Sequence, residues 1–178
     1  MITPSSAKLL VFVHEQLVCI KIVGRANFTS SIDFKMLVNE LMEKQFTCFL
    51  LDLSQCVLMD STFLGVMAGF GLKMTVAPGS QRNGQSIELL NPNPRIAELL
   101  ENLGVAHLFK VVDETAALPP GCTSHMLSET AEPTREEVKR NCLEAHRILM
   151  AIDPANIPKF KEVAQFLAED LKKSSNGT

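Results

Sequence analysis

The sequence has no tryptophan and no tyrosine, so any aromatic surface must come from its ten phenylalanines. Positive charge is also scarce, because 17 lysines and arginines stand against 20 aspartates and glutamates, for a formal net charge of -3. The basic residues form no block, and a nucleic-acid-binding protein depends on such a block to neutralise phosphates. We therefore expect no nucleic-acid partner, and any role in transcription would be exerted through other proteins.

Long apolar runs are missing too. The longest apolar segments are interrupted by Asp52, Asp60 or Lys73, and none approaches the roughly 20 residues that a membrane-spanning helix needs. The first residues, MITPSSAKLLVFVHEQ, lack the basic start and the long apolar centre of a secretory signal. We expect a cytoplasmic protein without direct membrane insertion.

The cysteines are odd in number and widely spaced. No CxxC pair occurs, which argues against a zinc site. Cys19 and Cys48 lie within apolar, strand-like runs, where a free thiol packs as a small hydrophobic group. We expect free thiols at all five positions, which are Cys19, Cys48, Cys56, Cys122 and Cys142.

Common catalytic motifs are absent as well. The sequence contains no GxxxxGKS/T, GxSxG or HExxH pattern. Asp52 and Asp60 could form a carboxylate pair, but loop hydrogen bonding and helix capping explain them more simply. With no convergent polar site, we expect no enzymatic activity, no metal and no cofactor. The histidines are scattered, and we expect a surface or loop position for each of them: His14, His107, His125 and His146.

The first 114 residues are predicted to alternate between strands and helices. Short β-rich runs bounded by polar segments indicate strands, which are expected at residues 8–13, 17–23, 47–53, 86–90 and 107–112. The run TCFLLDL is nearly all apolar, which is typical of a central parallel strand. Helices are expected from about residue 30, where Ser30 and Asp33 suggest a capping pattern, to residue 44, and at residues 61–77 and 95–103. The segments 27–30, 54–59 and 78–85 are expected to be loops or connections. This order predicts an α/β domain with a mixed sheet.

The remaining chain has a different character. Residues 115–133 combine prolines with serines and threonines and show no periodicity, which indicates a linker. Thr134 and Glu137 form a capping box ahead of a helix that ends near Ile152. Asp153-Pro154 breaks the pattern, and a second amphipathic helix follows. We therefore predict a domain at 1–114, a linker at 115–133, a helical hairpin at 134–173 and a disordered tail at 174–178.

The most specific segment is LLDLSQCVLMDSTFLGVMAGF, residues 50–70. An apolar strand ends in Asp52, a short connection follows, and DSTFLG (residues 60–65) opens a helix. This arrangement resembles the STAS family of anti-sigma-factor antagonists, whose pattern is roughly "vvlDls…DSsGlG". The resemblance extends over residues 8–114, including NPNPRIAELLENLGVAHLF, and implies a STAS-like mixed sheet packed with helices.

The resemblance also implies a phosphorylation switch. Aligned residue by residue, Thr62 takes the place of the phosphorylated residue, with Ser61 as the second candidate. The implied partners are a GHKL-type anti-sigma-factor kinase, which the unphosphorylated chain binds so that a sigma factor is released, and a phosphatase that resets the switch. The implied docking surface contains Asn27, Phe28, Thr29, Asp60, Ser61 and Phe63, with Asp52 and Gly65 as structural support.

Two features of the DSTFLG helix bear on this interpretation. Phe63 replaces the glycine that commonly follows the acceptor, and its bulk would either narrow the access of a kinase or contact the partner. A helix start offers free N–H groups and the positive end of the dipole, so a phosphate on Thr62 should be tolerated there. Gly65 and Gly69 share one helix face and permit the close approach of a neighbouring element.

Other functions remain open at this level. A STAS-like chain can be a scaffold that does not switch, or an accessory subunit of a signalling or membrane-transport complex. A small-ligand-binding domain is a weaker alternative. Each helix of the C-terminal hairpin carries one apolar stripe, so we expect the hairpin to pack on its own domain or on a second copy in a homodimer.

Overall fold

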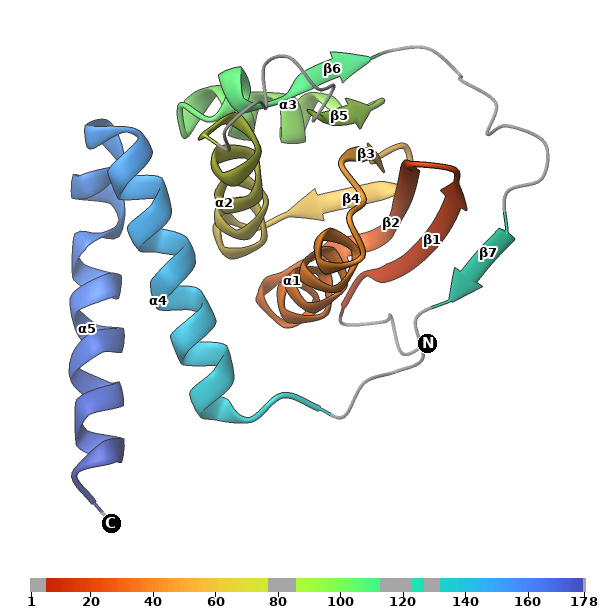
Figure 1. The fold of residues 1–178 in the computed structure, drawn as a ribbon. Helices are drawn as coiled ribbons and strands as arrows, with labels where there is room; N and C mark the ends of the chain where they lie inside the picture. Colours follow the sequence, from red (N-terminus) through yellow and green to blue (C-terminus); the bar gives the residue numbers. More distant parts are fainter. Residues whose placement is uncertain (1–5, 77–85, 113–122, 127–131, 178) are drawn as a thin grey trace, which may run out of the picture.

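The computed structural model describes residues 6–76, 86–112, 123–126 and 132–177. Its strands form one mixed sheet with the order β6-β5-β3-β2-β1-β7, and β4 pairs with β2 outside this path (Figure 1). The strands are β1 Lys8–His14, β2 Leu17–Ala26, β3 Cys48–Asp52, β4 Cys56–Met59, β5 Ser86–Leu90, β6 Lys110–Val112 and β7 Thr123–Met126. The helices are α1 Phe28–Glu43, α2 Ser61–Val76, α3 Pro94–Asn102, α4 Arg135–Ile152 and α5 Ile157–Ser175. The predicted fold class, a mixed sheet packed with helices and followed by two C-terminal helices, is confirmed.

The sheet begins with the predicted antiparallel hairpin. Lys8 of β1 lies opposite Val23 of β2, and the connecting turn holds Glu15 at a φ of 52°. Strands β2, β3, β5 and β6 then run parallel to one another. Because β3 lies between β2 and β5, the interpretation of TCFLLDL as a central parallel strand is confirmed.

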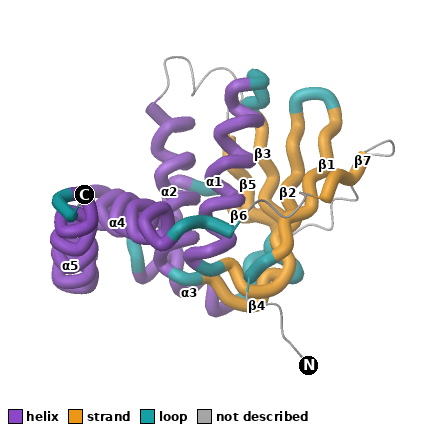
Figure 2. The backbone as a smooth tube through the Cα atoms, turned by 90° about the horizontal axis from the view of Figure 1, so that it is seen from below, coloured by secondary structure: helices purple, strands orange, loops and turns teal. Residues whose placement is uncertain are grey.

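Helices α1 and α2 cover one face of the sheet, and α4 and α5 lie outside them (Figure 2). The main core lies between the sheet and α1 and α2, where Phe34, Phe63 and Ile20 are among the largest fully buried side chains. The ring centroids of Phe34 and Phe63 are 4.9 Å apart. The two helices are therefore packed against each other as well as against the sheet.

Strand β4 lies within residues 54–59, which the sequence predicts to be a plain connection, and that prediction is wrong. The register of β2 shifts between Gly24 and Arg25. Gly24 has a φ of 96°, a conformation that residues with a side chain rarely adopt. The end of β2 then pairs with β4, with Ala26 opposite Met59. Because these two parallel strands end side by side, the helices that follow them, α1 and α2, also begin side by side.

Helix α1 begins earlier than predicted, so residues 27–30 are not a loop. The Asn27 side chain accepts a hydrogen bond from the Ser30 amide at 3.1 Å, and the Ser30 hydroxyl accepts one from the Asn27 amide at 3.0 Å. This reciprocal pair satisfies two backbone donors at the start of the helix, which is why the helix begins at Phe28. This part of the expected docking surface is therefore the N-cap and first turn of α1.

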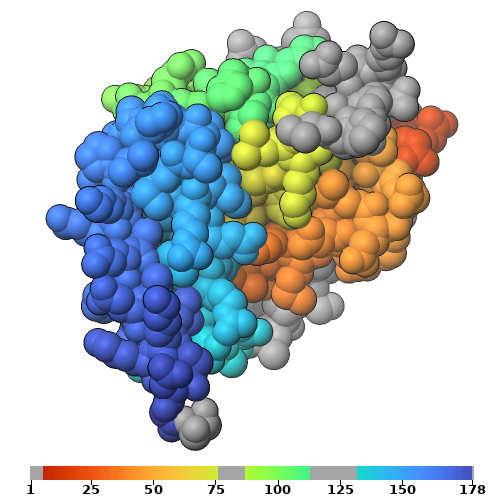
Figure 3. Space-filling model, turned by 60° about the vertical axis from the view of Figure 1, so that its left-hand side comes forward, coloured from red at the N-terminus to blue at the C-terminus, as the bar shows by residue number. Residues whose placement is uncertain are grey.

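The C-terminal hairpin, formed by α4 and α5, packs on the STAS-like part of its own chain. Figures 1 and 3 show α4 against α2, with α5 on the outside. The glycines of α2 provide the expected close approach. A methyl group on Gly65 would lie 2.6 Å from the Ala145 carbonyl oxygen, whereas one on Gly69 would meet the tip of the Ile148 side chain at 3.0 Å.

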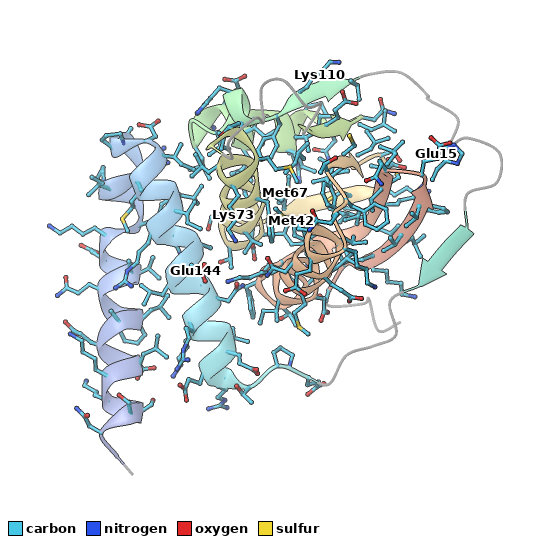
Figure 4. The ribbon with its side chains drawn as sticks, viewed as in Figure 1. Glu15, Met42, Met67, Lys73, Lys110 and Glu144 are labelled. Carbon is cyan, nitrogen blue, oxygen red and sulfur yellow. The ribbon has the colours of Figure 1, made fainter. Side chains whose placement is uncertain are left out.

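Polar contacts fix the middle of α4 and the turn after it to other elements. Near the turn before α5, Asn156 is fully buried, and its amide donates hydrogen bonds to the carbonyls of Leu103 and Leu149, both at 2.9 Å. Glu144 lies on the side of α4 that faces α1 and α2 (Figure 4) and pairs with Lys35 of α1 at 2.5 Å. The hairpin is therefore bound to α1 and to the end of α3 as well as to α2.

Several predicted boundaries differ from the structure. Strand β6 begins at Lys110 because residues 106–108 form a 3₁₀ turn. The predicted linker contains β7, which pairs antiparallel with β1. Helix α5 continues to Ser175, into the tail expected to be disordered, and the loop expected at 78–85 lies outside the described residues.

Two further expectations concern the whole chain. Over the described ranges, no helix is both long enough and apolar enough to cross a membrane. Cys122 lies outside those ranges. As predicted, none of the other four cysteines is in a disulfide bond: Cys19, Cys48, Cys56 and Cys142.

Replacing Asn156 with alanine should lower the free energy of unfolding by about 1–3 kcal/mol, because the Leu103 and Leu149 carbonyls lose their buried donor. Urea denaturation measures this change. The exposed Asn102→Ala is the matched control and should change stability by less than about 0.5 kcal/mol. Equal stability of the two variants would show that the buried amide does not fix the hairpin.

Candidate functional site

The starts of α1 and α2 meet at the carboxylate of Asp60. The Asp60 amide donates a hydrogen bond to the Ala26 carbonyl at 2.9 Å, next to the pairing of β2 with β4. Its Oδ2 accepts one from the Phe28 amide at 2.7 Å, and its Oδ1 accepts one from the Phe63 amide at 2.8 Å. Both donors are first-turn amides that a helix leaves free. One side chain therefore caps α2 and joins α1 to it, so two segments of the expected docking face are in contact.

Thr62 and Ser61 lie beneath α4. Thr62 is only 5% exposed, and its hydroxyl donates a hydrogen bond to Cys142 Sγ at 3.6 Å. The Ser61 hydroxyl lies 3.0 Å from His146 Nε2. Cys142 and His146 are four residues apart and so lie on one face of α4. The first turn of α2, which the sequence predicts to be an open docking surface, is covered by the C-terminal hairpin.

Burial shifts the ionisation of three groups at this contact. It raises the pKa of the Asp60 carboxyl, although hydrogen bonds from the Phe63 and Phe28 amides act in the opposite direction. Burial lowers the pKa of the His146 ring, whereas a hydrogen bond with the backbone of Cys142 and the charge of Asp60 act to raise it. Burial also raises the pKa of the Cys142 thiol. The neutral forms of His146 and Cys142 are therefore favoured, and neither residue compensates the Asp60 carboxylate at neutral pH.

The aromatic residues expected on the docking face are placed differently from each other. Phe28 is 46% exposed, and Thr29 beside it is partly exposed. Phe63 is fully buried against Phe34, so in this conformation its side chain does not lie on the surface that the sequence predicts for it. The reason is its place on the core-facing side of α2, where a bulky side chain fills the space between the helices.

Gly65 and Asp52, the two residues expected to support the site, lie in different places. Gly65 lies directly behind the first turn of α2, where it admits α4. Asp52 is engaged elsewhere, because its carboxylate accepts a hydrogen bond from the Ser54 amide at 2.9 Å and pairs with Lys21 at 3.5 Å. Asp52 therefore stabilises the end of β3 and its turn, and no ligand role follows from these contacts.

His146 is buried, so the expectation of a surface or loop position for every histidine is wrong. Its ring packs on Phe160 of α5, with 4.8 Å between the ring centroids. The sequence does contain a signal for this position. His146 stands four residues after Cys142 and three before Leu149, which places it on the buried face of α4.

The Ser61 and His146 side chains are separated by a distance typical of a serine nucleophile and its general base. However, the cavities of about 340 and 260 Å³ that adjoin α4 are lined by other residues. In the part of the chain that the structure describes, no group of three or more His, Cys, Asp and Glu side chains is arranged to hold a metal. The Ser61 and Thr62 hydroxyls lie instead in the contact between α2 and α4.

Comparison with protein families supports the assignment made from the DSTFLG segment. The family model of the STAS domain matches residues 9–117, which include Asp60, Ser61 and Thr62. The chain belongs to the STAS domain family. The match ends before α4, so the hairpin that covers Thr62 lies outside the matched STAS region. A comparison with curated proteins finds no match.

Solved structures agree with this assignment at the level of the fold. A candidate anti-sigma factor antagonist from Thermotoga maritima is 20% identical with a TM-score of 0.50, and the match covers 59% of this chain and 86% of that one. The anti-sigma factor antagonist SpoIIAA in its unphosphorylated form is 17% identical with a TM-score of 0.50, over 61% of this chain and 90% of that one. These similarities show a common STAS fold.

Asp60→Ala should lower the free energy of unfolding by about 2–3 kcal/mol, because the first-turn amides of Phe28 and Phe63 lose a charged acceptor. Asp60→Asn is the matched variant and should lose less, since one side-chain oxygen remains to accept a hydrogen bond. Urea denaturation at pH 7 compares the two. If both variants are as stable as the wild type, the carboxylate does not hold the two helix starts together.

Stability should fall as the pH is lowered from 7.5 to 5.5. The pKa of His146 is lower in the folded chain than its ordinary value of 6.5, so the unfolded chain takes up the proton first and is favoured as the pH falls. The pKa of Asp60 is raised in the folded chain, so at lower pH the folded chain takes up this proton first and Asp60 favours folding as the pH falls. His146→Gln should therefore reduce the dependence of the unfolding free energy on pH across this interval. Urea titrations at pH 7.5 and pH 5.5 measure the unfolding free energy of both proteins. If it changes between these pH values by the same amount in His146→Gln as in the wild type, the prediction is contradicted.

Proposed function

We propose that the chain is an anti-sigma-factor antagonist whose binding is switched by phosphorylation of Thr62. The unphosphorylated chain binds a GHKL-type anti-sigma-factor kinase, and a sigma factor is released. The kinase phosphorylates Thr62, with Ser61 as the secondary acceptor, and the complex separates. A phosphatase then restores the first state.

The observation that carries this proposal is the position of Thr62 in the first turn of α2 within a STAS domain. A phosphate at a helix start is stabilised by backbone N–H groups and by the helix dipole. Its charge of about -1.5 to -2 beside Asp60 would oppose the docking of a protein. The contact of Asp60 with the Phe28 amide supports one docking surface made by the starts of α1 and α2. The exposed ring of Phe28 adds an apolar group to that surface.

The proposed chemistry requires only an acceptor from this chain. The Thr62 oxygen forms a bond to the γ-phosphorus of ATP while the bond between that phosphorus and the bridging oxygen of ADP breaks. The hydroxyl proton passes to a base of the kinase, and ADP leaves. The kinase supplies the nucleotide site and the positive charge that stabilises the transferred phosphoryl group.

A second candidate is a STAS scaffold that does not switch, or an accessory subunit of a signalling or membrane-transport complex. The burial of Thr62 favours this alternative, because a residue that is 5% exposed, with its hydroxyl against Cys142 of α4, is out of reach of another enzyme in this conformation. The two candidates differ in whether Thr62 is ever phosphorylated.

Incubation with GHKL-type anti-sigma-factor kinases of the source organism and ATP should label Thr62, as located by peptide mass spectrometry. Thr62→Ala should remove most of the incorporated phosphate and Ser61→Ala much less. Thr75→Ala, at an exposed hydroxyl on the same helix, is the control and should keep full labelling. Undiminished labelling of Thr62→Ala would place the acceptor elsewhere. Stable binding of such a kinase without any labelling would support the scaffold.

A further inference from the structure

The contact between α4 and the first turn of α2 covers the proposed acceptor with side chains from outside the matched STAS region. Cys142 lies against the Thr62 hydroxyl, and His146 lies against the Ser61 hydroxyl. Immediately behind them, Ala145 fills the space left by Gly65. A kinase must bring its ATP in line with the Thr62 oxygen, and α4 occupies that position.

We propose that the C-terminal hairpin is an internal cover of Thr62, and that α4 has to move off α2 before a kinase can use this hydroxyl. This inference rests on the proposed function, which it deepens by naming how the site is regulated. The hairpin and the kinase compete for the same turn of α2. The fraction of molecules with α4 displaced then limits the rate of phosphorylation.

The composition of the contact favours reversible displacement over permanent burial. Asn141 of α4 donates a buried hydrogen bond to the Ser31 hydroxyl at 2.8 Å, while its Oδ1 has no hydrogen-bond partner in the described part of the chain. Water can satisfy both ends of this side chain when α4 moves away. A helix selected only to complete a core would carry an apolar group at this position.

The hairpin also has a point about which α4 can move. Asn156 fixes the turn between α4 and α5 to the end of α3 through the Leu103 carbonyl. Cys142 and His146 lie earlier on α4, away from that turn. The cover therefore leaves Thr62 while the turn stays attached, and full unfolding of the chain is not needed.

Phosphorylation and coverage exclude each other. A phosphate on Thr62 needs the space that Cys142 occupies, and it places a dianion next to the partly buried carboxylate of Asp60. The neutral form of His146 is favoured by burial, so α4 offers no compensating charge there. Because the coupling is reciprocal, displacement of α4 promotes phosphorylation, and phosphorylation keeps α4 displaced.

The test measures access to position 62 without a kinase. Thr62→Cys is combined with Cys142→Ser, the protein is exposed to N-ethylmaleimide under native conditions, and peptide mass spectrometry follows each thiol. Cys19 and Cys56, both 2% exposed, report global unfolding within the same molecule. We expect the thiol at position 62 to be labelled at least about tenfold faster than either, with little dependence on low urea concentrations, as for a local opening. Equal rates with equal urea dependence at all three positions would overturn the proposal.

Matched variants at the glycine contact identify the element that moves. Gly65→Ala places a methyl group against the backbone of Ala145, whereas Gly69→Ala meets only the flexible tip of Ile148. Both changes affect helix propensity alike. Gly65→Ala should speed labelling at position 62 severalfold, and Gly69→Ala should have little effect. If Gly65→Ala does not fold, Ala145→Val crowds the same contact from α4. If Gly65→Ala or Ala145→Val folds and labelling at position 62 is unchanged, the proposal is overturned.

The two proposals fail separately. The labelling rates depend on the movement of α4 alone, so rapid labelling with no phosphorylation by any GHKL-type kinase would support the cover and contradict the switch. If Thr62 is phosphorylated but the thiol at position 62 is labelled at the same rate as Cys19 and Cys56, the switch is supported and the cover is overturned. When both hold, Gly65→Ala is phosphorylated faster than the wild type by the same factor as its labelling.

Discussion

The close approach of α4 to α2 at Gly65 is the contact on which the environment of Thr62 and Ser61 depends. With no side chain at this position, the backbone of α4 at Ala145 reaches the backbone of α2. Cys142, three residues before Ala145 on α4, then meets Thr62, and His146, directly after Ala145, meets Ser61. Any side chain at position 65 would separate the helices and change the environment of both hydroxyls.

A second constraint is the pairing of β2 with β4. Gly24 lets β2 change register, and the two strands then end side by side. The starts of α1 and α2 are therefore neighbours, and a single carboxylate, Asp60, accepts hydrogen bonds from both. The docking surface that we propose for a STAS partner follows from this strand geometry and not from a loop.

The first turn of α2 is subject to two opposing requirements. The phosphoryl transfer that we propose requires an exposed Thr62 hydroxyl, whereas the C-terminal hairpin buries Thr62 in a partly polar contact. The STAS match ends at residue 117, so the hairpin is an addition to the matched region that acts directly on its most specific segment. An appended element of this kind can regulate a domain without altering the residues that carry its chemistry, because it changes only their accessibility.

The sequence by itself determined the features that depend on neighbouring residues. The β1–β2 hairpin, the central strand in TCFLLDL, the capping box of Thr134 and Glu137, and the membership of the STAS family all follow from local patterns. The glycine spacing also predicted that some element would approach α2 closely.

Only the tertiary structure decided which element that is and what it covers. Strand β4 carries too weak a pattern to be predicted and exists through its pairing with β2. The burial of Phe63 and His146 depends on how whole helices are oriented. Thr62 has the same local sequence whether it is open or covered, because its exposure is set by α4, about 80 residues further along the chain. Contacts between segments so distant in sequence depend on how complete surfaces fit together, and no local pattern records that fit.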